Sequence, residues 1–173
     1  MAKFDATGPM ATHSYNTFRG SVSGVHYAKL TLPPDTVTTP APVLVNLHGG
    51  FWKTDWGLTN LPTAELLKAF GDGVATWDVE YARVDQADPA SSAAGGGWPH
   101  SNLDCLAALN ALAELPPAVL SRLDLRRVYL CGHSAGAHLA LWLGLVSRLD
   151  APELERLSEL IGALAGDAAA TAA

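Results

Sequence analysis

The chain has 173 residues, 49% of them hydrophobic and 16% charged, and a formal net charge of −6. This length suits one ordered domain and is too short for two, and the negative charge argues against nucleic acid or an anionic membrane as a main partner. Because residues 1–5 lack the apolar start of a signal peptide, and the apolar run Ala135–Val146 is too short to span a membrane, we expect a soluble cytoplasmic domain.

Segments typical of strands alternate with segments typical of helices along the chain. Residues 1–24 are polar and predict a loose N-terminal lead-in, and the alanine-rich residues 166–173 predict a frayed tail. The apolar patterns between them predict strands at 25–32, 42–47, 74–81 and 125–131, and helices at 63–70, from 101, at 137–146 and from 150. Such alternation predicts an α/β fold, with a mostly parallel sheet flanked by helices in three α/β/α layers.

The most informative motif is Gly132-His133-Ser134-Ala135-Gly136, which lies between an expected strand and an expected helix. A G-x-S-x-G pentapeptide in this context forms a nucleophile elbow, a sharp turn that exposes the serine hydroxyl above the sheet. Gly132 and Gly136 suit a close approach of strand and helix that leaves no room for a Cβ. The motif predicts Ser134 as a nucleophile.

A second motif, His48-Gly49-Gly50-Phe51-Trp52, directly follows the expected strand at 42–47. Acyl transfer develops negative charge on a carbonyl oxygen, and preorganised backbone N–H groups stabilise that charge. A His-Gly-Gly turn at this place is the lipase and esterase form of an oxyanion loop. The alternative interpretation is a tight turn with a packed histidine, which the presence of the elbow disfavours.

Residues from about 40 to 146 resemble the α/β-hydrolase fold, and within it the esterase and kynurenine formamidase-like branch. The matching segments are 48–52, 80–84, 96–99 and 132–138. The resemblance implies a single hydrolase domain over residues 25–165 that needs no cofactor.

The same resemblance assigns roles to individual residues. It implies that Ser134 is the nucleophile and that the N–H groups of Gly50, Phe51 and Ala135 form an oxyanion hole. It also implies that His48, with Gly49, supports the loop and is not the base.

The chain departs from the family pattern after the nucleophile helix. The family's acid and catalytic histidine lie on loops after later strands, and no segment up to Ala173 matches them. We therefore expect a truncated domain, and we assign the roles of catalytic acid and base to no residue of this chain. The strand at 125–131 would then form a sheet edge, and such an edge can pair with another copy of the chain.

The upstream histidines are weak candidates for the missing base. We expect His133 to project toward the core beneath the elbow and His138 to pack on the helix body. His13 and His26 belong to the N-terminal segment. His100, at the start of an expected helix, remains as the candidate for the base. No His-x-x-x-His pair has a carboxylate nearby, so we expect no metal site.

Other side chains have structural or binding interpretations. We expect Asp78 and Glu80 to pair with loop donors, and Cys105 and Cys131 to be buried thiols, with a disulfide between them as the alternative. Four aromatic residues are expected at the top of the sheet, where they either line an acyl or aryl pocket or cap the core: Phe51, Trp52, Trp56 and Trp98.

These observations leave three functions open. The first is a serine hydrolase that acts on a small carboxylic ester or aryl formamide through a Ser134 acyl-enzyme. The second is a hydrolase-fold fragment or binding module without turnover, and the third is a peptidase of the same fold.

Overall fold

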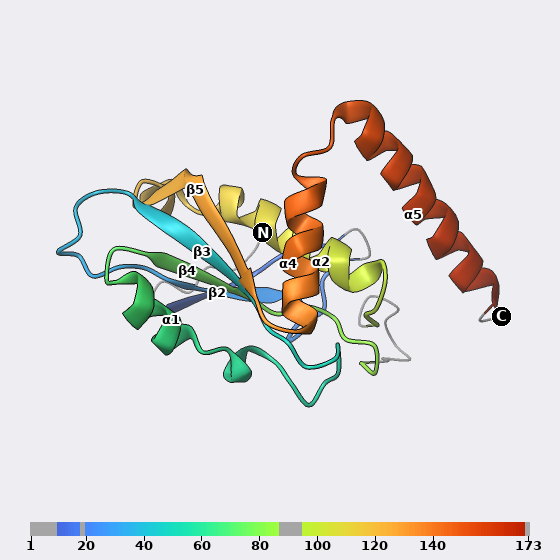
Figure 1. Ribbon diagram of the computed structural model, residues 1–173, viewed down its shortest axis with the longest axis horizontal. Coiled ribbons are helices and arrows are strands. Elements are labelled where there is room, and N and C mark those ends of the chain that lie inside the picture. The colour runs from blue at the N-terminus through green and yellow to red at the C-terminus, as the bar shows by residue number, and fades with distance from the viewer. Residues whose placement is uncertain (1–9, 18–19, 87–94, 172–173) are drawn as a thin grey trace.

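The computed structural model describes residues 10–17, 20–86 and 95–171 (Figure 1). The strands are β1 (Met10–Ser14), β2 (Tyr27–Thr31), β3 (Ala41–Leu47), β4 (Ala75–Val79) and β5 (Leu123–Gly132). The helices are α1 (Thr63–Phe70), α2 (His100–Ala111), α3 (Pro117–Leu120), α4 (Ala135–Val146) and α5 (Ala151–Thr171), with 3-10 turns at Leu58–Asn60 and Leu112–Glu114. Among these elements, no helix is long and apolar enough to cross a membrane.

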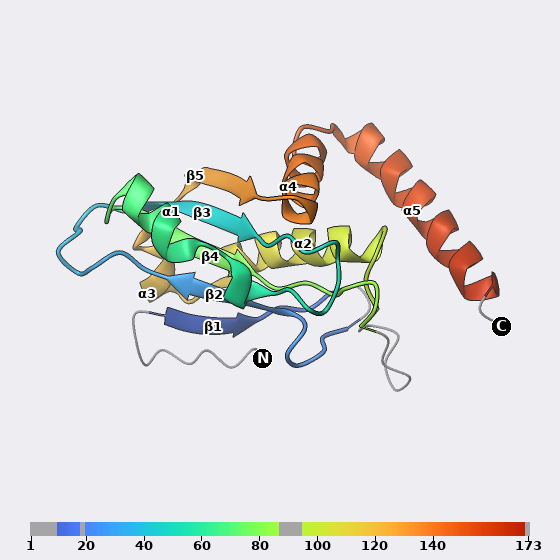
Figure 2. The same cartoon turned by 60° about the horizontal axis from the view of Figure 1, so that its bottom comes forward.

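The five strands form one mixed sheet in the order β1-β2-β4-β3-β5 (Figure 2). β3 pairs in parallel with both β4 and β5, whereas β2 pairs antiparallel with β1 and with β4. The register aligns Leu47 with Val79 on one side and with Gly132 on the other. β3, β4 and β5 therefore end at the same end of the sheet, and the two motifs begin at the ends of β3 and β5.

Helices cover both faces of this sheet. The Trp77 indole donates a hydrogen bond to the Ala108 carbonyl of α2 at 2.9 Å, and the neighbouring Asp78 accepts one from Thr63, the first residue of α1, at 3.0 Å. Because successive residues of a strand point to opposite faces, α2 and α1 lie on opposite sides, as Figure 2 shows. α4 packs on β3 and β5 beside α2, which confirms the expected α/β sandwich.

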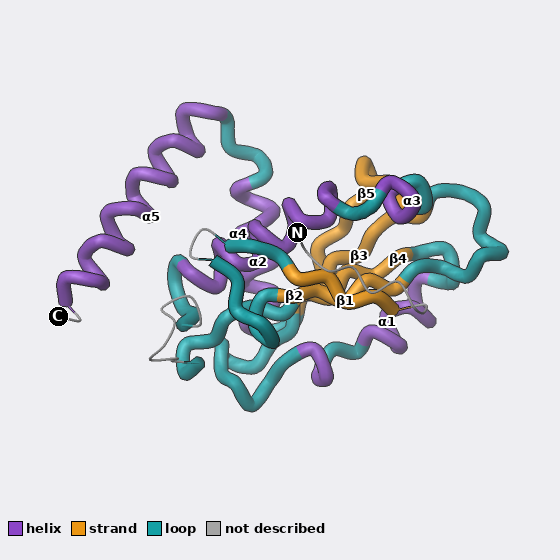
Figure 3. The backbone as a smooth tube through the Cα atoms, turned by 180° about the vertical axis from the view of Figure 1, so that it is seen from behind, coloured by secondary structure: helices purple, strands orange, loops and turns teal. Residues whose placement is uncertain are grey.

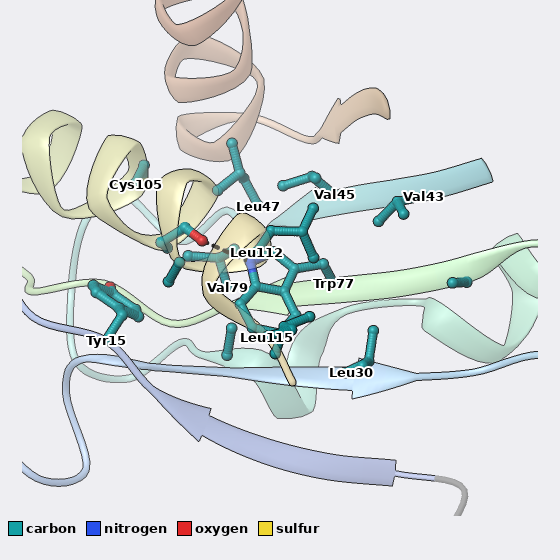
Figure 4. Packing of buried hydrophobic residues seen from close by; sticks show 14 of the residues in the cluster. Tyr15, Leu30, Val43, Val45, Leu47, Trp77, Val79, Cys105, Leu112 and Leu115 are labelled. Carbon is teal, nitrogen blue, oxygen red and sulfur yellow. Dashed lines mark hydrogen bonds between the residues drawn. The ribbon is translucent and has the colours of Figure 1, made fainter. Parts of the chain in front are cut away.

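The core lies between the sheet and α2. Every residue of β4 is buried, and β3 is buried from Val43 to Leu47, as expected for strands covered on both faces. Trp77 is fully buried and lies close to Val45, Leu112 and Leu115 (Figure 4). This packing fixes the ends of β3 and β4, from which the candidate site is built.

The structure differs from the expectations at both ends of the chain. Within the expected lead-in, residues 10–14 form β1, and Tyr15 donates a buried hydrogen bond to the Glu80 carbonyl at 2.5 Å. At the other end, α5 continues through the expected tail to Thr171, because alanine is the residue most favourable to helix. α5 extends away from the sheet beyond α4, as the view from behind also shows (Figure 3).

β5 occupies an edge of the sheet, as expected. Tyr129 on this strand is 56% exposed, and Leu141 on the neighbouring α4 is 71% exposed. Both line an apolar groove of about 730 Å³ that runs along β5 and α4. An exposed strand edge beside an apolar surface favours pairing with another chain.

We predict that the chain self-associates through this edge. Replacing Tyr129→Lys together with Leu141→Glu should raise the monomer fraction in sedimentation velocity, because charges disfavour burial of the groove. Phe70→Lys removes an exposed aromatic residue of α1 and should leave association unchanged. A wild-type chain that stays monomeric at high concentration would contradict the expectation.

Candidate active site

Ser134 lies at a sharp turn between β5 and α4. Its backbone dihedrals are φ 54° and ψ −121°, a region that non-glycine residues rarely adopt. Ser134 is the N-cap residue of α4, its carbonyl accepts the N–H of His138, and its side chain is exposed. The turn predicted from the pentapeptide is therefore present, with the hydroxyl-bearing side chain on the surface at the end of the sheet.

The two glycines of the pentapeptide lie where backbones touch. A Cβ on Gly132 would collide with the backbone of Gly136, and a Cβ on Gly136 would collide with the carbonyl oxygen of Leu47. These contacts are with backbone atoms and not with flexible side chains. The steric reason expected from the sequence is therefore correct for both positions.

The His-Gly-Gly loop also has a strained backbone. Phe51 and Trp52 both have φ 55°, and Gly50 has φ 112°. Gly49 comes so close to the turn after β5 that an added Cβ would lie 2.7 Å from the His133 carbonyl oxygen and 3.3 Å from the Cβ of Ser134. The loop after β3 and the loop after β5 are thus in direct contact beside the start of α4 (Figure 1).

Three backbone donors remain unused around this contact. Within residues 10–17, 20–86 and 95–171, no hydrogen bond has the N–H of Gly50, Phe51 or Ala135 as its donor. Ala135 is the first residue of α4, where an N–H has no partner within the helix. These are the three amides that the resemblance implies for an oxyanion hole.

The loops after β3 and β5 line a shared recess of about 150 Å³. Its lining consists of Gly49, Gly50, Phe51, Trp56, Asn60, His133 and Ser134. Asn60 was not expected there, and no feature of the sequence marks it, because its position depends on how the loop after β3 folds back.

A buried polar network lies beneath the His-Gly-Gly loop. The His48 ring has Nε2 2.8 Å from Glu80 Oε1 and Nδ1 2.8 Å from the Gly49 carbonyl oxygen, and it stacks on Tyr81 at 4.3 Å. Arg83 lies 2.9 Å from Glu80 Oε1. Burial raises the pKa of the Tyr81 phenol, which keeps its hydroxyl protonated as the donor to the His48 carbonyl at 2.6 Å. The His48 ring thus contacts the backbone of its own loop at the Gly49 carbonyl.

Glu80 has a loop donor as expected, whereas the donors to Asp78 lie in β3 and at the start of α1 and not in a loop. Glu80 Oε2 accepts the Leu58 N–H at 3.3 Å, and Asp78 accepts hydrogen bonds from Asn46 at 2.6 Å and from Thr63. Burial raises the pKa of Asp78 even though these two donors lower it. The pairing of Glu80 with His48 was not expected, although both residues directly follow buried strands that run side by side.

Two of the four aromatic residues line the recess, and the other two pack against neighbouring rings. Phe51, which is 74% exposed, and Trp56 line the recess. Trp52 packs edge-on against His138 at 5.5 Å, and Trp98 packs edge-on against Trp142 at 6.1 Å. Trp52 and Trp98 therefore lie outside the lining of the recess.

The histidines differ from expectation at one position. His133 is exposed and lines the recess, and does not project into the core, because β5 ends at Gly132 and strand alternation no longer applies at the next residue. His138 packs against Trp52, and His100 is half-buried at the start of α2. His13 and His26 are buried near β1 and β2, and burial lowers the pKa of His13.

Neither cysteine is in a disulfide. Cys105 is a buried free thiol, and Cys131 is a half-buried one. Among the described residues, no group of three or more histidine, cysteine or acidic side chains is placed to hold a metal ion.

The fold and this arrangement of loops define an α/β-hydrolase. The family model BD-FAE matches residues 29–161. The chain therefore belongs to the BD-FAE family, an α/β-hydrolase esterase family. A search of the curated proteins finds no match to this chain.

Solved structures with the same fold include several esterases. Esterase B from Lactobacillus rhamnosis superposes with a TM-score of 0.62 at 22% identity, over 89% of this chain and 44% of that one. A fungal esterase from Rhizomucor miehei has a TM-score of 0.54 at 22% identity, over 81% and 38%. Carboxyl esterase 2 from Tuber melanosporum has a TM-score of 0.51 at 24% identity, over 81% and 37%. The chain thus spans less than half the length of these esterases.

We predict that Gly136→Ala destabilises the fold by about 1–3 kcal/mol, because the added methyl group must displace the Leu47 backbone. Urea denaturation measures the effect. The matched control is Gly162→Ala in α5, where an added Cβ meets nothing within 4 Å; it should be neutral or stabilise by up to about 1 kcal/mol. Equal effects of the two substitutions would contradict the steric explanation.

Proposed function

We propose that this chain carries the nucleophile and the oxyanion-stabilising part of a serine hydrolase that acts on small carboxylic esters. One observation supports this most strongly. Ser134 lies exposed on a strained turn, in a recess shared with Gly50 and Phe51, and the N–H groups of Gly50, Phe51 and Ala135 have no acceptor among the described residues. Strained turns and unused backbone donors beside a nucleophile are typical of acyl-transfer sites.

The proposed reaction passes through an acyl-enzyme. Ser134 Oγ bonds to the substrate carbonyl carbon, and its proton goes to a general base. The carbonyl oxygen becomes an oxyanion that accepts hydrogen bonds from the three N–H groups. The tetrahedral intermediate then releases the alcohol, which takes up a proton, and water hydrolyses the acyl-enzyme. We assign neither the base nor the acid to a residue of this chain.

The substrate class rests on the family and on the lining of the recess. Phe51 and Trp56 offer apolar surface to an acyl or aryl group next to Ser134. An aryl formamide would present the same type of carbonyl carbon, and a peptide would present a poorer leaving group. Comparing turnover of phenyl acetate, formanilide and a short peptide separates these classes, and we expect the ester to react fastest.

The alternative is a hydrolase-fold binding module without turnover. It would have the same recess, so only reactivity at Ser134 separates it from an enzyme. The two free thiols are typical of a reducing compartment, and on that basis we propose that the protein acts in the cytoplasm.

We predict that a fluorophosphonate probe forms a covalent adduct on Ser134, detected by intact mass and peptide mapping. An organophosphorus probe suits this fold, because the esterase B structure from Lactobacillus rhamnosis is described as inhibited with a tributyrin phosphonate. Ser134→Ala should abolish the adduct. The control Ser147→Ala, at the other end of α4, should leave it unchanged. A folded wild-type chain that is not labelled would favour the binding module.

A further inference from the structure

The His48 ring lies between two oxygen acceptors. Nε2 is 2.8 Å from a carboxylate oxygen of Glu80, and Nδ1 is 2.8 Å from the carbonyl oxygen of Gly49. A neutral imidazole has one N–H donor and one acceptor nitrogen, whereas the imidazolium ion has two donors. A neutral ring would therefore direct a lone pair at one of these oxygens.

Glu80 is placed to be ionised and not to share a proton with the ring. Its Oε1 lies 2.9 Å from the Arg83 guanidinium and also accepts the Tyr81 N–H at 3.1 Å, while Oε2 accepts the Leu58 N–H. All these partners are donors, which suits a carboxylate. Because Glu80 and Arg83 are both buried, each charge needs its partner. An ionised Glu80 calls for a donor at Nε2, and the Gly49 carbonyl calls for a donor at Nδ1, so the two contacts together favour protons on both ring nitrogens.

The bond to Gly49 bears directly on the oxyanion loop. In a planar trans peptide, the C=O of one residue and the N–H of the next point in opposite directions. The Gly49 carbonyl faces the His48 ring, so the Gly50 N–H faces away from it. That N–H is one of the three unused donors, and Gly50 lines the recess with Ser134.

The same ion pair anchors the far end of the loop. Arg83 Nη1 donates to the Trp56 carbonyl at 2.6 Å, and Glu80 binds the Leu58 N–H two residues later. The intervening Gly57 passes so close that an added Cβ would lie 2.8 Å from Glu80 Oε2. One carboxylate therefore holds the loop at His48 and again at Leu58.

We propose that Glu80, paired with Arg83, is a positioning residue that keeps His48 doubly protonated, so that its Nδ1–H orients the Gly49–Gly50 peptide and turns the Gly50 N–H toward the recess. The catalytic meaning of this inference rests on the proposed function. Glu80, Arg83 and His48 then carry one net positive charge, beside the peptide at which the oxyanion would form. A fixed positive charge at that place stabilises developing negative charge.

The first test is independent of catalysis. In histidine-¹⁵N-labelled protein at neutral pH, we expect the His48 ring to show two protonated nitrogens, with His48→Gln serving to assign the signal. Glu80→Gln should convert His48 to the singly protonated form and, in uniformly ¹⁵N-labelled protein, shift the Gly50 backbone amide resonance. A singly protonated His48 in the wild-type chain would overturn the proposal, even if the Glu80 variant failed to fold.

The matched control is Asp78→Asn. It neutralises another buried carboxylate of the same chain segment, one bonded to Asn46 and Thr63 and not to the oxyanion loop. This variant should leave the His48 and Gly50 signals unchanged. If both variants shift the two signals alike, the effect reports general destabilisation and the proposal fails.

The second test measures function. The rate constant for fluorophosphonate labelling of Ser134 should fall at least tenfold in Glu80→Gln and less than twofold in Asp78→Asn, compared at equal folded fractions. Unchanged labelling in Glu80→Gln would overturn the positioning role. A wild-type chain without labelling would overturn the proposed function instead, and the ring and amide signals would then decide the inference on their own.

Discussion

The candidate site depends on two pairs of backbone segments that approach one another more closely than side chains would permit. The first turn of α4 touches the end of β3 at Gly136 and Leu47, and the loop after β3 touches the turn after β5 at Gly49 and His133. Glycine at positions 49 and 136 lacks the Cβ atom that would collide with the facing backbone and keep the segments apart. The contact brings Ser134 to the same recess as Gly50 and Phe51 of the loop after β3.

Such an approach requires backbone strain, which the packing around it must hold. Residues in sparsely populated φ/ψ regions cost on the order of 1–3 kcal/mol each, and Phe51, Trp52 and Ser134 all have positive φ. Ser134 is held by β5 on one side and by α4 on the other, and α4 is packed on the sheet through the buried Leu139 and Leu143. The loop after β3 is held instead by polar contacts from His48, Glu80 and Arg83. Apolar packing of α4 thus holds one side of the recess, and buried ionic contacts hold the other.

Much of this arrangement could be predicted from the chain itself. The pentapeptide indicated the turn at Ser134, and the pattern after it predicted a helix that α4 confirms to its last residue, Val146. β1 was missed because its five residues carry too weak an alternation to stand out from a polar segment. The exposed position of His133 was missed because β5 ends at Gly132, so strand alternation does not extend to His133.

The sequence by itself determined the fold class and the close approach of the two loops, because both depend on local features: apolar periodicity, paired glycines, and a serine between a strand and a helix. Only the tertiary structure decided which polar groups meet beneath the loop. His48 and Glu80 are 32 residues apart, and they pair because β3 and β4 lie side by side in register. Local patterns do not encode that register. It is set by the packing of Trp77 and its neighbours against α2, which positions the strand ends relative to one another.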